Sequence, residues 1–381
     1  MRIVHVTPHL PPDQAANALL PFQLGEWARA RGDTVHYVAH PPANSIADQR
    51  GDPRPDVTWI PRTKRSFLQR AIRTGSIAGA WRIRRETATL LEQADVVHVH
   101  SNGLLAEVAA RLAAQLGKPV VLTLYGTEIW HYRRKLGPDL FTRAYRNADA
   151  VTFYSQKLLE RARELGLSRR RCSVIYPPVA ASFTFHDADA MLAVRRALGL
   201  TAANVLVNVK RLHPLAGQRY LLEAMPAVLL DHPDTHLVIC GTGALLPDLQ
   251  AVARSAGVEP HVTFAGLVDN ARVAQYCAAS DLFLLPSLLE ALPTVAVEAL
   301  ASGTPVISSD NPGGLELRGV FGDDVAVVPK EQPQALGRAI SAALSRKRRT
   351  NAATQALVEQ RFRADAVARQ YWDVYASVIA Q

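Results

Sequence analysis

Short runs of β-branched residues alternate with longer segments of helical periodicity along the whole chain. Strands separated by helices of about 10 to 15 residues form βαβ units, and such units build a parallel sheet that is covered on both faces. The pattern therefore predicts an α/β protein with two Rossmann-like halves. The expected strands lie at 2–7, 34–40, 96–100, 120–126 and 150–155, then at 204–210, 236–241, 262–266, 282–287, 305–310 and 325–329.

The segment between the halves, YPPVAASFTFHDADA, has no clear period and contains the consecutive prolines Pro177 and Pro178. Because consecutive prolines continue neither a helix nor a sheet, we expect a linker here. The predicted domains are residues 1–176 and 177–363. A last helix at about 364–381 carries apolar residues at helical spacing, and we expect it to pack back on the first domain.

The length of 381 residues fits two domains. With 48% hydrophobic and 20% charged residues, the composition excludes a disordered, collagen-like or coiled-coil protein. No apolar run reaches the roughly 18 residues of a membrane span, and the chain enters a strand pattern at once without a signal peptide. We therefore expect a cytoplasmic protein. Its cysteines, which we expect to be buried thiols, are Cys172, Cys240 and Cys277.

The positive charge is concentrated in the first half. Residues 1–180 contain 26 Lys and Arg against 15 Asp and Glu, a net charge of +11, whereas residues 181–381 contain 17 against 19, a net charge of −2. A strong net positive charge in one half of the chain indicates that this half has an anionic partner, such as a phosphate, an acidic lipid or a nucleic acid.

Two glutamates, Glu290 and Glu298, stand eight residues apart in LLPSLLEALPTVAVEALASG. The apolar run before them predicts a buried strand, and Pro293 suits the first position of a helix. Glu298 would then lie inside an almost wholly apolar helix, where an unpaired carboxylate is costly and usually functional. The amides of Leu292 and Thr294 at the start of this helix would form an anion site.

This E-x7-E spacing is followed by ALASGTPVISSD and NPGG, and the chain also contains ADVVHVHS, PVVLTLYGTEIW, VKRL, HPDTHLVICGTG and VTFAGLVDN. As a set and in this order, the motifs resemble the retaining, nucleotide-sugar-dependent glycosyltransferases of the GT-B fold, namely glycosyltransferase family 4 (glycosyl transferases group 1). The resemblance covers most of the chain. It implies two Rossmann-like domains whose parallel sheets face each other across a cleft, the first binding the acceptor and the second the nucleotide sugar.

The resemblance also implies site residues. Glu298 would bind the ribose hydroxyls of the donor, Glu290 would face the transferred sugar, and Arg211 would neutralise the diphosphate leaving group. Tyr125 stands where the family often has a histidine that contacts the donor sugar. Further donor contacts would come from Gly241, Gly243, Leu292, Thr294, Gly266 and Val268, and the acceptor side would include Glu128, His100 and Asn17.

The reaction that the family carries out needs neither a protein nucleophile nor a metal. Negative charge grows on the diphosphate as the anomeric bond breaks, so fixed cations and helix amides stabilise the transition state more than the ground state. We therefore expect no cofactor, only a nucleoside diphosphate sugar as donor substrate. The single D-x-D, Asp187-Ala188-Asp189, precedes a helix pattern, and a helix cap is its expected role.

Three positions depart from the family pattern. Ala216 stands where a second diphosphate-binding lysine is usual. Tyr125 can form hydrogen bonds but is not an easily protonated group. Ala15 and Ala16 replace a glycine pair, and a loop that needs positive φ there would be strained. The candidates to replace the lysine are Lys210, which should point to the face opposite Arg211, together with His213 and Arg219.

The pair His98 and His100 alternates with valines and so points to one face of a strand. No carboxylate or third ligand is apparent nearby, so we expect no metal, with His98 satisfied in the core and His100 near the cleft. His131 stays open between a role on the acceptor side and none.

The acceptor is the least determined part of the function. The segment 63–91 interleaves basic and apolar residues, which suits an anionic membrane surface or a phosphorylated acceptor, whereas a helix with solvated arginines is the simpler alternative. Its basic residues are Lys64, Arg65, Arg70, Arg73, Arg82, Arg84 and Arg85, and its apolar ones include Phe67, Leu68, Ile72, Ile77, Trp81 and Ile83. We expect a sugar, lipid-linked or small-molecule acceptor, with peripheral contact to the inner face of the membrane left open.

Two other functions remain compatible with the same residues. One is a degenerate family member that binds a nucleotide sugar without turnover, and the other is a sugar-nucleotide epimerase of the same architecture. A nucleic-acid partner is suggested by charge alone and is supported by no recognisable module, so we expect none.

Overall fold

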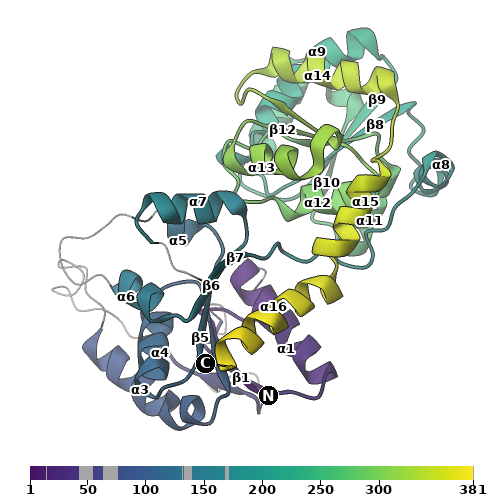
Figure 1. Cartoon of the computed structure of the whole chain (residues 1–381). Helices are drawn as coiled ribbons and strands as arrows, with labels where there is room; N and C mark the ends of the chain where they lie inside the picture. Colours follow the sequence, from purple (N-terminus) through teal and green to yellow (C-terminus); the bar gives the residue numbers. More distant parts are fainter. Residues whose placement is uncertain are drawn as a thin grey trace. The chain divides into compact units, whose positions relative to one another are not determined.

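The computed structural model describes residues 1–13, 15–42, 55–62, 76–130, 132, 140–167 and 171–380. The chain divides into two compact units (Figure 1). Unit 1 comprises Met1–Tyr176 and Ala368–Gln381, and unit 2 comprises Pro177–Val367. Within the described residues, no helix combines the length and the apolar character needed to cross a bilayer.

Among the described residues, unit 1 contains a seven-stranded parallel sheet in the order β3-β2-β1-β4-β5-β6-β7. All residues of the two central strands β4 and β5 are buried, as expected for strands covered on both faces. The three-residue edge strands β3 and β7 were not predicted, because they are too short to show a pattern. The strands are β1 (Arg2–Val6), β2 (Thr34–Ala39), β3 (Val57–Trp59), β4 (Val96–His100), β5 (Val120–Leu124), β6 (Ala150–Phe153) and β7 (Cys172–Val174).

Helices cover this sheet, and α4 lies between α3 and α6 (Figure 1). The helices are α1 (Ala16–Ala30), α3 (Ile77–Glu92), α4 (Leu104–Gln115), α5 (Thr127–Trp130), α6 (Leu140–Asn147) and α7 (Gln156–Glu164). The end of the last helix, α16 (Ala364–Ile379), packs into unit 1, where Tyr375 and Val378 join a core cluster with Ile3 and Val96. This helix therefore returns to the sheet formed by the first residues of the chain.

In the described part of unit 2, six parallel strands follow the order β10-β9-β8-β11-β12-β13, and they match the six expected in this half. They are β8 (Asn204–Val209), β9 (Thr235–Cys240), β10 (Val262–Gly266), β11 (Leu282–Leu285), β12 (Val306–Ser309) and β13 (Val325–Val328). The helical elements are α8 (Ala188–Ala197), η1 (Pro214–Ala216), α9 (Gln218–Asp231), α10 (Leu246–Ser255), η2 (Glu259–His261), α11 (Asn270–Ala279), α12 (Thr294–Ala301), α13 (Pro312–Phe321), η3 (Gly322–Asp324), α14 (Pro333–Arg346) and α15 (Ala352–Arg361).

Polar side chains fix the starts of several helices. In each case an oxygen accepts a hydrogen bond from the amide three residues further on, which satisfies one of the free donors of the first turn. These capping residues include Ser76, Ser155, Asp187, Asp269 and Asn311. The expected capping role of the D-x-D motif is thus confirmed at Asp187, whose side chain accepts from the amide of Ala190 at 2.9 Å.

The strand orders place a topological switch point in each sheet. In unit 1, β2 and β4 lie on opposite sides of β1, so the sheet first grows from β1 to β3 on one side and then from β4 to β7 on the other. In unit 2, β9 and β11 lie on opposite sides of β8 in the same way. Open parallel sheets bind ligands outside the carboxyl ends of the strands at such points. The two places to search are therefore the segments that follow β1 and β4, and those that follow β8 and β11.

Candidate active site

At the switch point of unit 2, an ion pair joins the two segments that follow β8 and β11. Lys210 Nζ lies 2.5 Å from Glu290 Oε1, with only 25% and 11% of the two side chains exposed. Lys210, one of the candidates to replace the missing lysine, therefore lies at the site beside Glu290. The strand ends at Val209, so its alternation does not extend to this residue. Arg211 is exposed and makes no ion pair with any residue that the structure describes.

His213 follows Lys210 and Arg211 in the chain and is the N-cap of the short helix η1. Its Nδ1 accepts a hydrogen bond from the amide of Leu215 at 3.2 Å. Burial, followed by the charges of Arg211 and Lys210, lowers the pKa of His213. The imidazole is therefore neutral at pH 7 and does not replace the missing lysine as a cation.

The position of that lysine, Ala216, is fully buried at the end of η1. The neighbouring Gly217 is equally confined, since a Cβ there would overlap the carbonyl oxygen of Pro286. A longer side chain at Ala216 would have to insert into packed structure, which costs stability. Lys210 is thus the cation that this chain places beside Glu290.

Glu298 lies in α12 and is partly buried among apolar residues. Among the described residues, no hydrogen bond or ion pair reaches its carboxylate. Burial alone raises the pKa of Glu298 to about 7. A carboxylate that is desolvated and has no partner among the described residues can accept hydrogen bonds from a ligand.

The start of α12 provides free backbone donors close to this acid. The helix begins at Thr294, one residue later than expected, and Pro293 is its N-cap. The amides of Leu292 and Thr294 donate to no protein group among the described residues. The helix is only eight residues long, and the segment that contains Glu290 leads into its positive end.

The NPGG motif supports the same segment from the next helix. Gly313 donates its amide to the Glu290 carbonyl at 3.0 Å, and a Cβ at Gly313 would come within 2.8 Å of the Glu290 Cβ. Asn311 caps α13 and also donates to the carbonyl of Ser287 at 2.7 Å. These contacts hold the segment after β11 in place, a positioning role that the motif alone did not reveal.

The glycines assigned to the phosphates have a structural reason of their own. Gly241 has a φ of 142°, and a Cβ there would overlap the carbonyl oxygen of Lys210, while a Cβ at Gly243 would overlap that of Leu212. The segments after β8 and β9 therefore pack backbone to backbone. Gly266 ends the edge strand β10 and accepts from the Gly241 amide at 2.7 Å, and Val268 follows in the next turn, partly buried.

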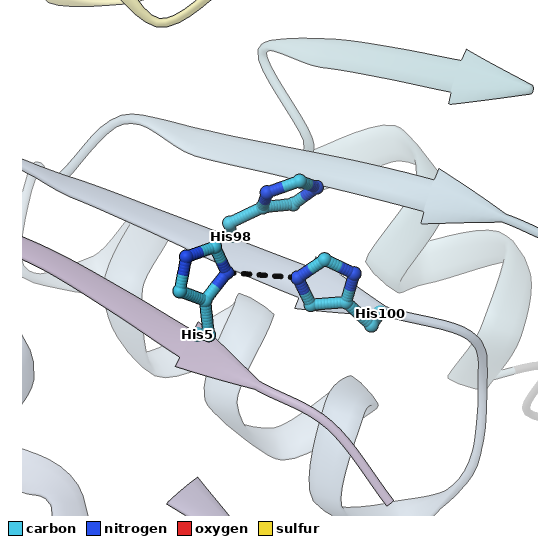
Figure 2. Close-up of side chains that lie close together, drawn as sticks. All are labelled: His5, His98 and His100. Atoms are coloured by element: carbon cyan, nitrogen blue, oxygen red, sulfur yellow. Dashed lines mark hydrogen bonds between the residues drawn. The ribbon is translucent and has the colours of Figure 1, made fainter. Parts of the chain in front are cut away.

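At the switch point of unit 1, three imidazoles come together (Figure 2). His98 and His100 point to the same face of β4, as expected, and His5 of the neighbouring strand β1 joins them. The expectation that no third ligand lies nearby was therefore wrong. His5 Nδ1 lies 2.9 Å from His100 Nε2, and all three side chains are fully buried.

Five of the six ring nitrogens in this cluster already have protein partners. His98 bonds to Tyr375 Oη at 2.6 Å and to Thr123 Oγ1 at 2.7 Å, so this histidine is satisfied in the core as expected. His100 Nδ1 bonds to Tyr125 Oη at 2.7 Å. Burial lowers the pKa of all three imidazoles, so they are neutral at pH 7.

Tyr125 follows β5 and connects the buried cluster with the end of the strand. Its phenol packs edge-to-face on Tyr154, and burial raises its pKa well above the ordinary value. Glu128 is buried, and its Oε2 accepts from the amide of Gly126 at 2.8 Å and that of Tyr125 at 3.3 Å. Glu128, the acid of the YGTE motif, therefore caps its own turn. The hydrogen bond between His100 and Tyr125 connects the buried cluster with the residue that follows β5.

The segment after β1 forms without the strain that its alanines suggested. Ala15 has a φ of −74° and is the N-cap of α1, which begins at Ala16. The replacement of a glycine pair is thus accommodated by an early start of the helix. Asn17 lies in the first turn, where its carbonyl accepts a hydrogen bond from the Thr7 hydroxyl.

Two further predicted features of unit 1 are His131 and the basic segment 63–91. His131 and residues 63–75 of the basic segment lie outside the described residues. The start of α3 is described, and it exposes 80% of Ile77 and 62% of Trp81. Arg85 stacks on Trp81 at 4.9 Å from the ring centre.

A pocket of about 290 Å³ opens in the described part of unit 2, at the amino-terminal edge of the sheet. The buried Arg195 and the partly buried Arg349 line it. Arg195 donates to the carbonyl of Ala279 and pairs with Asp281, and Arg349 donates to the carbonyls of Ser280 and Ser302. Because these guanidinium groups already join loops of the protein, and the pocket lies at the edge opposite Glu290, we do not assign the site to it.

The comparisons with known proteins agree with this geometry. Residues 22–183 match the sequence model of the family described as Glycosyltransferase Family 4, and residues 193–358 match that of Glycosyl transferases group 1. The chain belongs to glycosyltransferase family 4. The expected family is thereby confirmed, and the two models together span both units.

Named relatives are similar over part of their length. A GDP-mannose-dependent alpha-(1-6)-phosphatidylinositol monomannoside mannosyltransferase of Mycolicibacterium smegmatis is 29% identical over 65% of this chain and 66% of its own length. The putative teichuronic acid biosynthesis glycosyltransferase TuaC of Bacillus subtilis is 33% identical over 65% of this chain and 60% of its own. The matched regions thus span 60% to 66% of these relatives' own lengths.

Solved structures match over the whole chain. Sucrose-phosphate synthase from Thermosynechococcus elongatus superimposes with a TM-score of 0.75 at 20% identity, covering 100% of this chain and 99% of that one. HepE of Anabaena in complex with UDP gives a TM-score of 0.76 at 19% identity over 99% and 100%. The likeness confirms the expected α/β fold of the GT-B class.

Proposed function

We propose that this family member transfers a sugar from a nucleoside diphosphate sugar to an acceptor hydroxyl, with retention of the anomeric configuration. The observation that carries the proposal is the carboxylate of Glu298 near the start of α12, which is desolvated and has no protein partner among the residues that the structure describes. The ribose of a nucleotide has two hydroxyl donors that would satisfy it. HepE, which shares the fold, has been solved with UDP, and the mycobacterial relative is named as GDP-mannose-dependent.

The diphosphate would lie between the cations after β8 and the amides at the start of α12. Lys210 is held by Glu290 at 2.5 Å, whereas Arg211 is exposed and pairs with no carboxylate in the described part of the chain. Arg211 is therefore the cation that is free to meet the leaving group, and the amides of Leu292 and Thr294 would bind further oxygens. These protein groups stabilise an anion without a metal, so we propose that the transfer needs no cofactor.

In the proposed step, the bond between the anomeric carbon and the diphosphate oxygen breaks, and the acceptor oxygen bonds to that carbon from the same side. The acceptor proton passes to a diphosphate oxygen, so the products are a glycoside and a nucleoside diphosphate. Glu290 would face the transferred sugar, with Lys210 beside its carboxylate.

For the acceptor we propose an anionic, lipid-linked molecule at a membrane surface. Its support is the +11 charge of residues 1–180 and the start of α3, where Ile77 and Trp81 are exposed next to Arg82, Arg84 and Arg85. Exposed aromatic and apolar side chains beside arginines suit the interface of an anionic bilayer. The name of the mycobacterial relative contains a phosphatidylinositol mannoside as acceptor.

A panel of nucleoside diphosphates tests the donor site first. A ligand that binds only the folded protein raises its stability by RT ln(1 + [L]/Kd), so the correct diphosphate should raise the melting temperature. Glu298→Gln should abolish most of this shift, whereas Glu223→Gln, an acid on α9 paired with Arg219, should leave it unchanged. Equal shifts in both variants would remove Glu298 from the site.

The buried Ala216 supports one second candidate, a protein that binds a nucleotide sugar without turnover, because a diphosphate cation is absent from that position. Release of nucleoside diphosphate from the bound donor separates the two functions. Turnover supports the transferase, and tight binding with no release in the presence of acceptor lipids supports the binding protein.

A further inference from the structure

The pocket of about 290 Å³ in unit 2 lies at the edge of the sheet opposite Glu290. Its walls come from α8, the end of α14 and the first residues of β11 and β12. Most of the lining side chains are apolar, among them Met191, Leu192, Leu282, Val306, Ile307 and Leu344. An apolar protein cavity of about 150 Å³ binds benzene, so this pocket has room for a molecule about twice as large.

Five cationic side chains and three acids also line this pocket. Each acid is already paired with an arginine. The pairs are Asp281 with Arg195 at 2.9 Å, Asp323 with Arg318 at 2.8 Å and Asp324 with Arg348 at 3.5 Å. The lining cations that have no acidic partner among the described residues are Arg346, Lys347 and Arg349. The pocket therefore carries an excess of positive charge.

The three unpaired cations stand at two depths. Arg346 and Lys347 are exposed at the end of α14, where Lys347 is the C-cap. Arg349 is partly buried and donates to backbone carbonyls, which satisfy its hydrogen bonds but do not neutralise its charge. Burial lowers the pKa of Arg349 only to about 10, so this side chain is still a cation at neutral pH. A positive charge at the rim of an apolar pocket attracts an anion that has an apolar body.

We propose that this pocket binds a small molecule with an apolar body and one anionic head group. The apolar body would lie against Leu282, Ile307 and Leu344, and the head group would lie beside Arg346 and Lys347. The volume suits a single short chain or ring system and excludes a lipid with two long chains. Because all the lining residues belong to unit 2 and lie away from Glu290, this site does not depend on the proposed function.

The methionines provide a direct measurement of binding. The chain contains three, Met1, Met191 and Met225. Met191 lines the pocket, Met225 is fully buried in the core of the same unit, and Met1 belongs to unit 1. We would label the methionine methyl groups of the full chain with ¹³C, assign Met191 with Met191→Leu, and titrate sodium decanoate below its micelle concentration. The expected result is a saturable shift of the Met191 signal, with the signals of Met1 and Met225 unchanged.

The charge requirement is tested with a probe of opposite sign and with substitutions at the rim. Decylamine, which has an ammonium group on the same chain, should bind at least tenfold more weakly than decanoate. Arg346→Gln and Lys347→Asn should each weaken decanoate binding by about two- to fivefold, the effect of one exposed ion pair. Asparagine is tolerated in the left-handed conformation of Lys347, which has a φ of 42°. The matched control is Arg338→Gln, because Arg338 is exposed on the same helix but does not line the pocket.

Several results would overturn the proposal. They are an unchanged Met191 signal at every decanoate concentration, equal binding of decylamine, and an equal loss of affinity in Arg338→Gln. A joint shift of Met191 and Met225 would show that decanoate loosens the core of unit 2 and does not occupy a site. A shift of Met191 with phosphatidylglycerol vesicles but not with decanoate would assign the pocket to a membrane lipid and exclude a free small molecule.

Discussion

Replacement of Glu298 by glutamine should change how the stability of the protein depends on pH. Burial raises the pKa of this acid in the folded state from 4.5 to about 7, so the folded protein holds the proton more tightly than the unfolded chain. The ionised acid is therefore a cost to folding, absent below about pH 4.5 and complete above about pH 7. A difference of about 2.5 pKa units corresponds to roughly 3 kcal/mol.

Glu298→Gln keeps the shape and removes the titration. Relative to the wild type, the free energy of unfolding of the variant should rise by roughly 3 kcal/mol between pH 4.5 and pH 8. All five tryptophans lie in unit 1, so their fluorescence does not report on unit 2. Urea unfolding followed by circular dichroism is therefore the assay, with the variant of a partly exposed acid on α9, Glu223→Gln, as control.

The same acid should make donor binding dependent on pH. If the ionised carboxylate accepts from the ribose hydroxyls, the affinity for a sugar nucleotide should fall about tenfold per pH unit below pH 7 and level off above it. At pH 8, Glu298→Gln should weaken binding by about 1.5 to 3 kcal/mol, the range for hydrogen bonds to charged groups. Parallel stability curves for wild type and variant, together with unchanged affinity, would refute the reasoning.

Three further substitutions test other parts of the site. Arg211→Ala should reduce turnover more than nucleotide binding, because leaving-group charge develops in the transition state; a kcat/KM within about threefold of wild type, less than 1 kcal/mol, would exclude this role. Ala216→Lys should destabilise the protein by about 1 to 3 kcal/mol in urea unfolding, because the position is fully buried, and unchanged stability would show that the site has room. Trp81→Ser should weaken sedimentation with anionic vesicles at low salt, where wild-type binding should fall steeply as salt is added; equal binding to neutral vesicles would exclude electrostatic docking.

The sequence predicts the sheets well where the strands are central. All six strands of unit 2 were expected, because their apolar runs are buried on both faces and bounded by helical patterns. The edge strands Val57–Trp59 and Cys172–Val174 were missed, because three partly buried residues carry no alternation that distinguishes them from a loop.

The site shows a similar limit. Glu298 stands out in the sequence because its apolar neighbours already imply burial. His5 did not, because it lies 93 residues from His98, and only the pairing of β1 with β4 places it opposite that residue. The ion pair of Lys210 with Glu290 likewise depends on the exit of the chain from β8, which strand alternation does not describe.

The most direct test of the proposed transfer follows a sugar nucleotide that the protein binds, such as GDP-mannose or UDP-glucose, by ¹H NMR in the absence of acceptor. We expect slow release of nucleoside diphosphate, with the freed sugar first seen in the anomeric configuration that it had in the donor, and strongly reduced release in Arg211→Ala. Release of the opposite anomer would contradict retention, and no release from a bound donor, with or without anionic lipid acceptors, would contradict the transferase function itself.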